Sequence, residues 1–135
     1  MSMLQSAAAR YTEVRNATAT PGELLLALYD GLFRFMNGAK ACIAKGELGR
    51  ARELLSRSNA IVSELYIALD HPTHPELCAN LEGVYGFCMD RLTFASRKAN
   101  AEALDEVIRV LTPLREAWRL AVPKAIAEMH AGNRP

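Results

Sequence analysis

The sequence lacks a long apolar run and an excess of either charge. Its 135 residues contain 16 Lys and Arg and 15 Asp and Glu, which gives a net charge of +1. The most apolar stretch, residues 24–36, contains Asp30 and Arg34 and is shorter than the roughly 20 residues of a transmembrane helix. Proteins that bind nucleic acid or anionic membranes usually present a basic surface. We therefore expect neither nucleic-acid binding nor membrane insertion.

Cysteines are few, and none forms a CxxC pair. The three cysteines are Cys42, Cys78 and Cys88. They are odd in number and fall within apolar periodic stretches, which is typical of buried thiols in a reducing compartment. The first 20 residues also lack the charged start and apolar core of a secretory signal. The sequence thus predicts a cytoplasmic protein without structural zinc or a redox motif.

Residues that carry catalysis are equally scarce. His71 and His74 lie in a proline-containing loop, and His130 lies near the C-terminus. A phosphotransfer bundle needs an exposed histidine in the middle of a helix, and a di-iron bundle needs two Glu-x-x-His motifs; the sequence has neither. It also lacks a glycine-rich phosphate loop and a G-x-S-x-G motif. We expect no enzymatic activity, cofactor, metal or small-molecule substrate.

Apolar periodicity predicts four helices and no strands. Short breaks containing Gly, Pro or Asn separate them. The predicted helices span residues 21–44, 47–69, 73–98 and 100–123. Helices of this length joined by short connections must run antiparallel to their neighbours. The predicted fold is all-α, an antiparallel up-down-up-down four-helix bundle.

Capping residues mark three of the predicted helix starts. Thr20 with Glu23, and Thr73 with Glu76, have the spacing of capping boxes, and Asn100 is a preferred N-cap residue.

Two prolines affect the predicted fourth helix. Pro113 removes a hydrogen bond inside it and should kink it, and Pro123 is expected to end it. These boundaries divide the chain into a flexible leader (1–19), the bundle (20–123) and a short C-terminal tail (124–135).

The first predicted helix is apolar around more of its circumference than a bundle helix needs. Its expected core stripe contains Leu25, Leu28, Leu32, Phe35 and Ala39. Four further residues widen the apolar arc to about 200°, well beyond a stripe of somewhat over 100°. They are Leu26, Tyr29, Phe33 and Met36.

Besides Leu120, three apolar residues on other helices also fall outside the expected core stripes. They are Ile67, Phe87 and Phe94. Such residues are buried when a compact bundle curves around its flanking positions. Alternatively, they form an apolar groove for an amphipathic partner helix. The sequence leaves both interpretations open.

Several motifs occur in an order and spacing that resemble the flagellar secretion chaperone FliS family over residues 11–122. Tyr11 lies ten residues before the proline of TATPGEL (18–24), and LYDG (28–31) follows. NLEGVYGFCMDRL (80–92) resembles a third-helix motif of the family, and Trp118 its inward tryptophan. The chain differs from the family pattern at Val14, at Phe87, where the family has Tyr, and at Cys88, where it has Met.

The resemblance implies a cytoplasmic chaperone without enzymatic activity. Such a protein binds the disordered C-terminal segment of flagellin, prevents premature polymerisation and delivers it to the flagellar type III export gate. The leader, with Tyr11, would cover part of the groove until the client arrives. The candidate flagellin-binding residues are Tyr11, Leu26, Tyr29, Phe33, Ile67, Phe87 and Phe94. A structural bundle that homodimerises through the same surface is the main alternative, and a phosphotransfer module is a third.

Overall fold

Capping and turn residues set the ends of the helices. In the computed structural model, which describes residues 19–132, the Thr20 hydroxyl accepts a hydrogen bond from the Glu23 N–H at 3.1 Å. The Glu23 carboxylate returns to the Thr20 N–H at 3.5 Å, so the predicted capping box is present. Asn100 Oδ1 accepts from the Ala103 N–H at 2.7 Å and caps the last helix as predicted. Gly46, with a φ of 75°, supplies the left-handed residue of the first turn.

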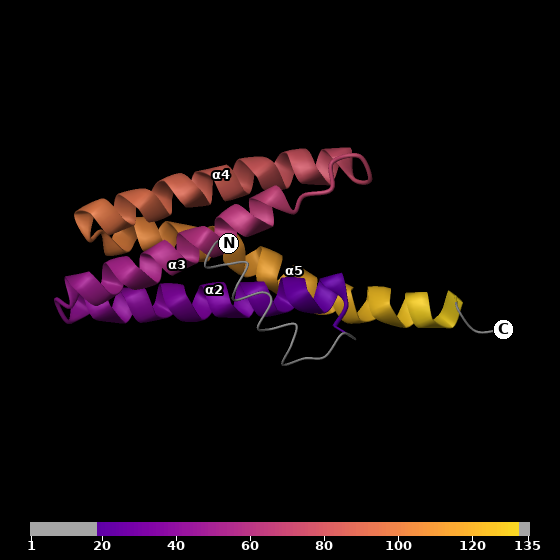
Figure 1. Ribbon diagram of the computed structural model, residues 1–135, viewed down its shortest axis with the longest axis horizontal. Coiled ribbons are helices and arrows are strands. Elements are labelled where there is room, and N and C mark those ends of the chain that lie inside the picture. Colours follow the sequence, from indigo (N-terminus) through magenta and orange to yellow (C-terminus); the bar gives the residue numbers. More distant parts are fainter. Residues whose placement is uncertain (1–18, 133–135) are drawn as a thin grey trace.

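The helices form the predicted all-α bundle (Figure 1). They are α2 (Pro21–Ala44), α3 (Leu48–Ile67), α4 (Pro75–Lys98) and α5 (Ala101–Gly132). Helices α2 and α4 each pack against both α3 and α5, so the four helices surround one core. Consecutive helices run in opposite directions because short turns join them. No strand occurs between residues 19 and 132.

Two predicted helix ends are wrong. Helix α4 begins at Pro75 with His74 as its N-cap residue and no side-chain cap, so Thr73 lies too far back to complete a capping box. Helix α5 continues through Pro123 to Gly132. Pro113 and Pro123 are both exposed. The carbonyl groups that lose their helical N–H partner there can bind water instead, which makes a proline tolerable.

A pair of tyrosines joins two helices at the centre of the core. The hydroxyl groups of Tyr29 (α2) and Tyr85 (α4) lie 2.7 Å apart and form a hydrogen bond in which either can donate. Both side chains are buried, as is the adjacent Cys88. The indole Nε1 of Trp118 is buried and has no hydrogen-bond partner among the described residues. The pair fixes how α2 faces α4, because a buried hydroxyl without a partner is costly.

Burial makes these groups hard to ionise in the folded protein. It raises the pKa of Cys88 from 9.0 to about 12. It is also the largest cause of the raised pKa values of Tyr29 and Tyr85. Each group therefore stabilises the fold fully below the pKa of the unfolded chain, and this contribution is lost as the pH rises toward the folded pKa.

We expect the free energy of unfolding to fall above about pH 9, by at most roughly 1.4 kcal/mol per pH unit for each such group. Replacing Cys88 with Ala removes one group and should make this fall shallower. Urea denaturation between pH 8 and pH 11 measures the slope, with Cys42→Ala as the control for removing a partly exposed thiol. Equal slopes for the wild type and Cys88→Ala would contradict the prediction.

The start of α2 touches the second half of α5 at a glycine. A Cβ atom on Gly22 would lie 2.7 Å from Cγ1 of Val122, whereas one on Gly83, in α4, would meet nothing within 4 Å. Gly22→Ala should therefore destabilise the protein by about 1–3 kcal/mol through overpacking. Gly83→Ala should stabilise it by about 0.5–1 kcal/mol through helix propensity. Urea unfolding measures both values, and a neutral or stabilising Gly22→Ala would contradict this contact.

Candidate partner-binding surface

The structure places two of the candidate residues in the core. Tyr29 and Phe33 are buried, so the expectation that they lie on a partner-binding surface is wrong for this state of the protein. The physical reason is that α2 packs against both α3 and α5, which together cover a wider arc than one neighbour would. Arg115 of α5 also covers Phe33, with its guanidinium carbon 4.6 Å from the ring centroid. Tyr29 and Phe33 therefore fit the interpretation in which a compact bundle buries the residues beside its core stripes.

The other candidates on α2 and α4 differ in exposure. Leu26 and Phe94 are half-buried, and Phe87 is 42% exposed. The guanidinium carbon of Arg91 lies 4.7 Å from the Phe94 ring centroid, and Phe94 packs against the core. Of these three residues, Phe87 offers the most accessible apolar surface.

Ile67 and Phe87 point away from the core. Ile67 is 73% exposed. Nine residues separate Ile67 from the buried Ser58, and Phe87 from the buried Cys78. Nine residues are about two and a half helical turns, so each candidate lies opposite the buried side of its own helix. Ile67 and Phe87 therefore lie on the outer sides of two different helices. Tyr11 lies outside the described residues.

Helix α5 carries a row of apolar residues that begins with expected core positions and ends with Ala121 and Ala125, which the sequence analysis missed. Its core-facing side chains recur at spacings of four and three residues, the spacing of a coiled-coil seam. These are Val107, Leu111, Leu114, Trp118, Ala121 and Ala125. The first two are buried, the next two are half-buried, and the last two are exposed. The seam thus becomes exposed at Ala121 and Ala125, whereas Val122, between them, is buried against Gly22 at the start of α2.

We define the open stripe as Ala121, Ala125 and Met129, the exposed continuation of this seam. Met129 is 53% exposed. It follows Ala125 by four residues, which keeps it on the same side of the helix. The spacing of these residues can be read from the sequence. The prediction that Pro123 ends the helix, however, excluded residues 124–132 from the helical pattern.

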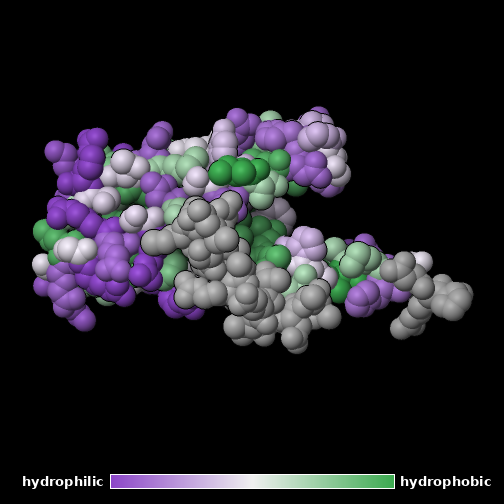
Figure 2. Space-filling view, viewed as in Figure 1, coloured by the Kyte–Doolittle hydropathy of each residue, from purple (hydrophilic) through white to green (hydrophobic). Residues whose placement is uncertain are grey.

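The part of α5 that carries the open stripe borders a notch at one end of the bundle. There α4 and the second half of α5 diverge, and α5 runs on beyond the start of α2 (Figure 1). Figure 2 shows a hollow between α4 and the second half of α5, with hydrophobic residues inside it. The combination of a notch and an uncovered apolar seam suits the docking of an amphipathic helix.

Leu77 supplies the opposite side of the notch. It lies in the first turn of α4 and is 46% exposed. Fourteen residues, or two heptads, separate it from Arg91, whose Nε donates to Glu106 of α5 at 3.0 Å. Residues two heptads apart share nearly the same side of a helix, so Leu77 lies on the α5-facing side of α4.

The rest of the described surface shows little that suits other chemistry. A shallow depression between α3 and α4 is lined by Ser56, Asn59, Ala60, Ser63 and Met89, none of which titrates near neutral pH. Within residues 19–132, no three His, Cys, Asp or Glu side chains gather as a metal site requires. None of the four described helices combines the length and apolarity that crossing a membrane demands.

Comparisons with known proteins identify the family. The family model described as "Flagellar protein FliS" matches residues 3–125. The flagellar secretion chaperone FliS of Bacillus subtilis is 33% identical over 116 residues, which cover 86% of each chain. That of Campylobacter jejuni is 31% identical and covers 81% of this chain and 85% of its own.

A solved structure shows the same fold. A crystal structure of a bacterial flagellar chaperone superposes with a TM-score of 0.72 at 20% identity, covering 89% of this chain and 98% of that one. The family match and the relatives span nearly the whole chain and not only one motif. The chain therefore belongs to the FliS family of flagellar secretion chaperones.

Proposed function

We propose that this protein is a cytoplasmic export chaperone that binds the C-terminal segment of flagellin. It would prevent premature polymerisation and deliver the client to the flagellar type III export gate. Membership in a family of flagellar secretion chaperones supports the general role. The observation that carries the binding mode is the apolar seam of α5, which continues as the open stripe beyond its cover.

The open stripe suits a client that folds as it binds. A disordered segment loses conformational entropy when it becomes helical, so its interface must be long. Small residues at 121 and 125 let a guest helix approach closely, and the flexible Met129 side chain adapts to its shape. A coiled-coil spacing also presents the stripe to a second helix in register.

The proposed interface extends beyond the notch. Phe87 and Ile67 project from the outer sides of α4 and α3, and Leu26 is half-buried on α2. Together with Phe94, they remain proposed contacts for a client long enough to wrap around the bundle. The proposal also includes Tyr11 of the leader, as a residue that competes with the client for apolar surface.

A charge placed in the open stripe should weaken client binding. Met129→Glu would bury an unpaired carboxylate beneath the guest helix, so we expect at least about tenfold weaker binding of a flagellin C-terminal peptide. Leu120→Glu is the matched control, because Leu120 is 78% exposed and nine residues from Met129, on the opposite side of α5. Isothermal titration calorimetry measures both affinities.

The outcomes separate the possible functions. Equal affinities of the two variants would exclude the open stripe as the binding site. A wild-type protein that binds no flagellin segment would exclude the proposed client. If the wild type instead forms a dimer that depends on its own concentration and on Met129, the homodimeric structural bundle is the better description.

Phe87 provides a test of the outer surface of α4. Because its side chain is 42% exposed, Phe87→Asp should weaken client binding while shifting the midpoint of thermal unfolding little. Phe94→Asp should destabilise the fold, because Phe94 packs against the core and under Arg91. Circular dichroism melts and peptide titrations compare the two variants. Strong destabilisation by Phe87→Asp would indicate a structural role and contradict this contact.

A further inference from the structure

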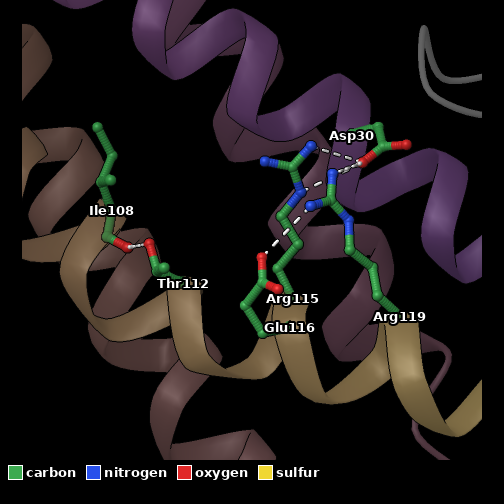
Figure 3. A network of polar contacts seen from close by, with 6 residues as sticks. All are labelled: Asp30, Ile108, Thr112, Arg115, Glu116 and Arg119. Atoms are coloured by element: carbon green, nitrogen blue, oxygen red, sulfur yellow. Dashed lines mark hydrogen bonds and ion pairs between the residues drawn. The ribbon is translucent and has the colours of Figure 1, made fainter.

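An ion-pair network joins α2 to the second half of α5. Asp30 Oδ1 accepts hydrogen bonds from Nε and Nη2 of Arg115 at 3.2 and 2.7 Å (Figure 3). Nη2 of Arg119 lies 3.5 Å from the same oxygen. We call Asp30, Arg115 and Arg119 the clasp. The Arg115 guanidinium also stacks on Phe33, so the clasp combines charge with a packing contact.

The helical hydrogen bonding of α5 is interrupted immediately before Arg115, the first clasp residue on this helix. Pro113 has no N–H, so the carbonyl of Arg109 lacks its normal helical partner. One residue earlier, the Thr112 hydroxyl donates to the carbonyl of Ile108 at 2.6 Å (Figure 3). Such a bond from a side chain to the preceding turn tends to bend helices. Residues 112 and 113 thus interrupt the regular hydrogen bonding of α5.

Apolar packing covers α5 less completely beyond residues 112 and 113 than before them, although Leu114 and Trp118 pack against the core and Ile126 is partly buried. Leu114 and Trp118 are only half-buried, and the open stripe after them is exposed. The buried contact beyond them is that of Val122 with Gly22 at the start of α2. Where hydrophobic burial is small, polar contacts have a larger share in setting position.

We propose that residues 114–132 form a hinged arm and that the clasp holds this arm against α2. The arm carries the open stripe, so its position sets the width of the notch. Asp30, Arg115 and Arg119 are then positioning residues, which need not touch a client. The consequence for client binding rests on the proposed function, whereas the consequence for the arm does not.

Hydrogen exchange tests the arm directly. Asp30→Ala removes the acceptor of the clasp. We expect amide exchange to rise roughly fivefold in residues 116–130 and to stay unchanged in 101–111, because a partly exposed ion pair has a modest strength. Lys40→Ala is the matched control, since Lys40 also lies on α2 and pairs with α5, at Asp105, 2.8 Å away and before the hinge. The control should leave exchange in the arm unchanged.

Two results would overturn the proposal. One is an Asp30→Ala variant in which the amide hydrogens of the arm exchange at the wild-type rate. The other is an increase in amide exchange that is spread evenly over the whole of α5. Pro113→Ala supplies an independent check, because it restores the missing N–H. In the Asp30→Ala background, it should return exchange in the arm at least partly toward the wild-type rate; no change would exclude the hinge.

Client binding forms the second readout. The Asp30→Ala variant should bind the flagellin C-terminal peptide several-fold more weakly, and Lys40→Ala should bind it as the wild type does. If the wild type binds no peptide, the proposed function fails while the exchange data still decide the hinged arm. If exchange in the arm rises but binding is unchanged, the arm exists and its role in setting the notch is excluded.

Discussion

The apolar seam of α5 begins in the core, where the other helices cover it, and ends in the exposed open stripe. From Val107 to Leu111 the seam lies in the core, where the Tyr29–Tyr85 hydrogen bond fixes how α2 faces α4. At Ala121, Ala125 and Met129 it is exposed. A large apolar side chain gains about 1.5–3 kcal/mol when fully buried, so an uncovered seam leaves stabilisation unused. A second polypeptide that covers it can draw on that free energy.

This arrangement is consistent with the biology of the FliS family. A chaperone must hold its client firmly enough to prevent assembly and still release it. The proposed interface, the open stripe, consists of small residues and one methionine, which would favour adaptable packing over tight shape complementarity. The clasp of Asp30, Arg115 and Arg119 adds a contact whose strength depends on charge and not on apolar area. In the proposed hinged arm, the position of the arm and the strength of client packing could therefore vary separately.

The accuracy of the sequence analysis differed between elements for physical reasons. The capping box at Thr20 and the cap at Asn100 were predictable because they depend on residues three positions apart. The burial of Phe33 was not, because it depends on Arg115, which lies far away in sequence. Pro123 misled the prediction of the helix end, since a proline stops a helix less effectively where water can reach the freed carbonyl.

The sequence alone determined the four helices found in residues 19–132, their antiparallel bundle and the family, because periodicity, caps and spaced motifs are local properties of the chain. It also determined that the chain has more apolar surface than four simple stripes require. Only the tertiary structure decided where the surplus lies. Packing against two neighbours buried the extra residues of α2, and the divergence of α4 from α5 left the end of the α5 seam exposed. Which apolar side chains remain exposed depends on the lengths and angles of neighbouring helices, which no single segment encodes.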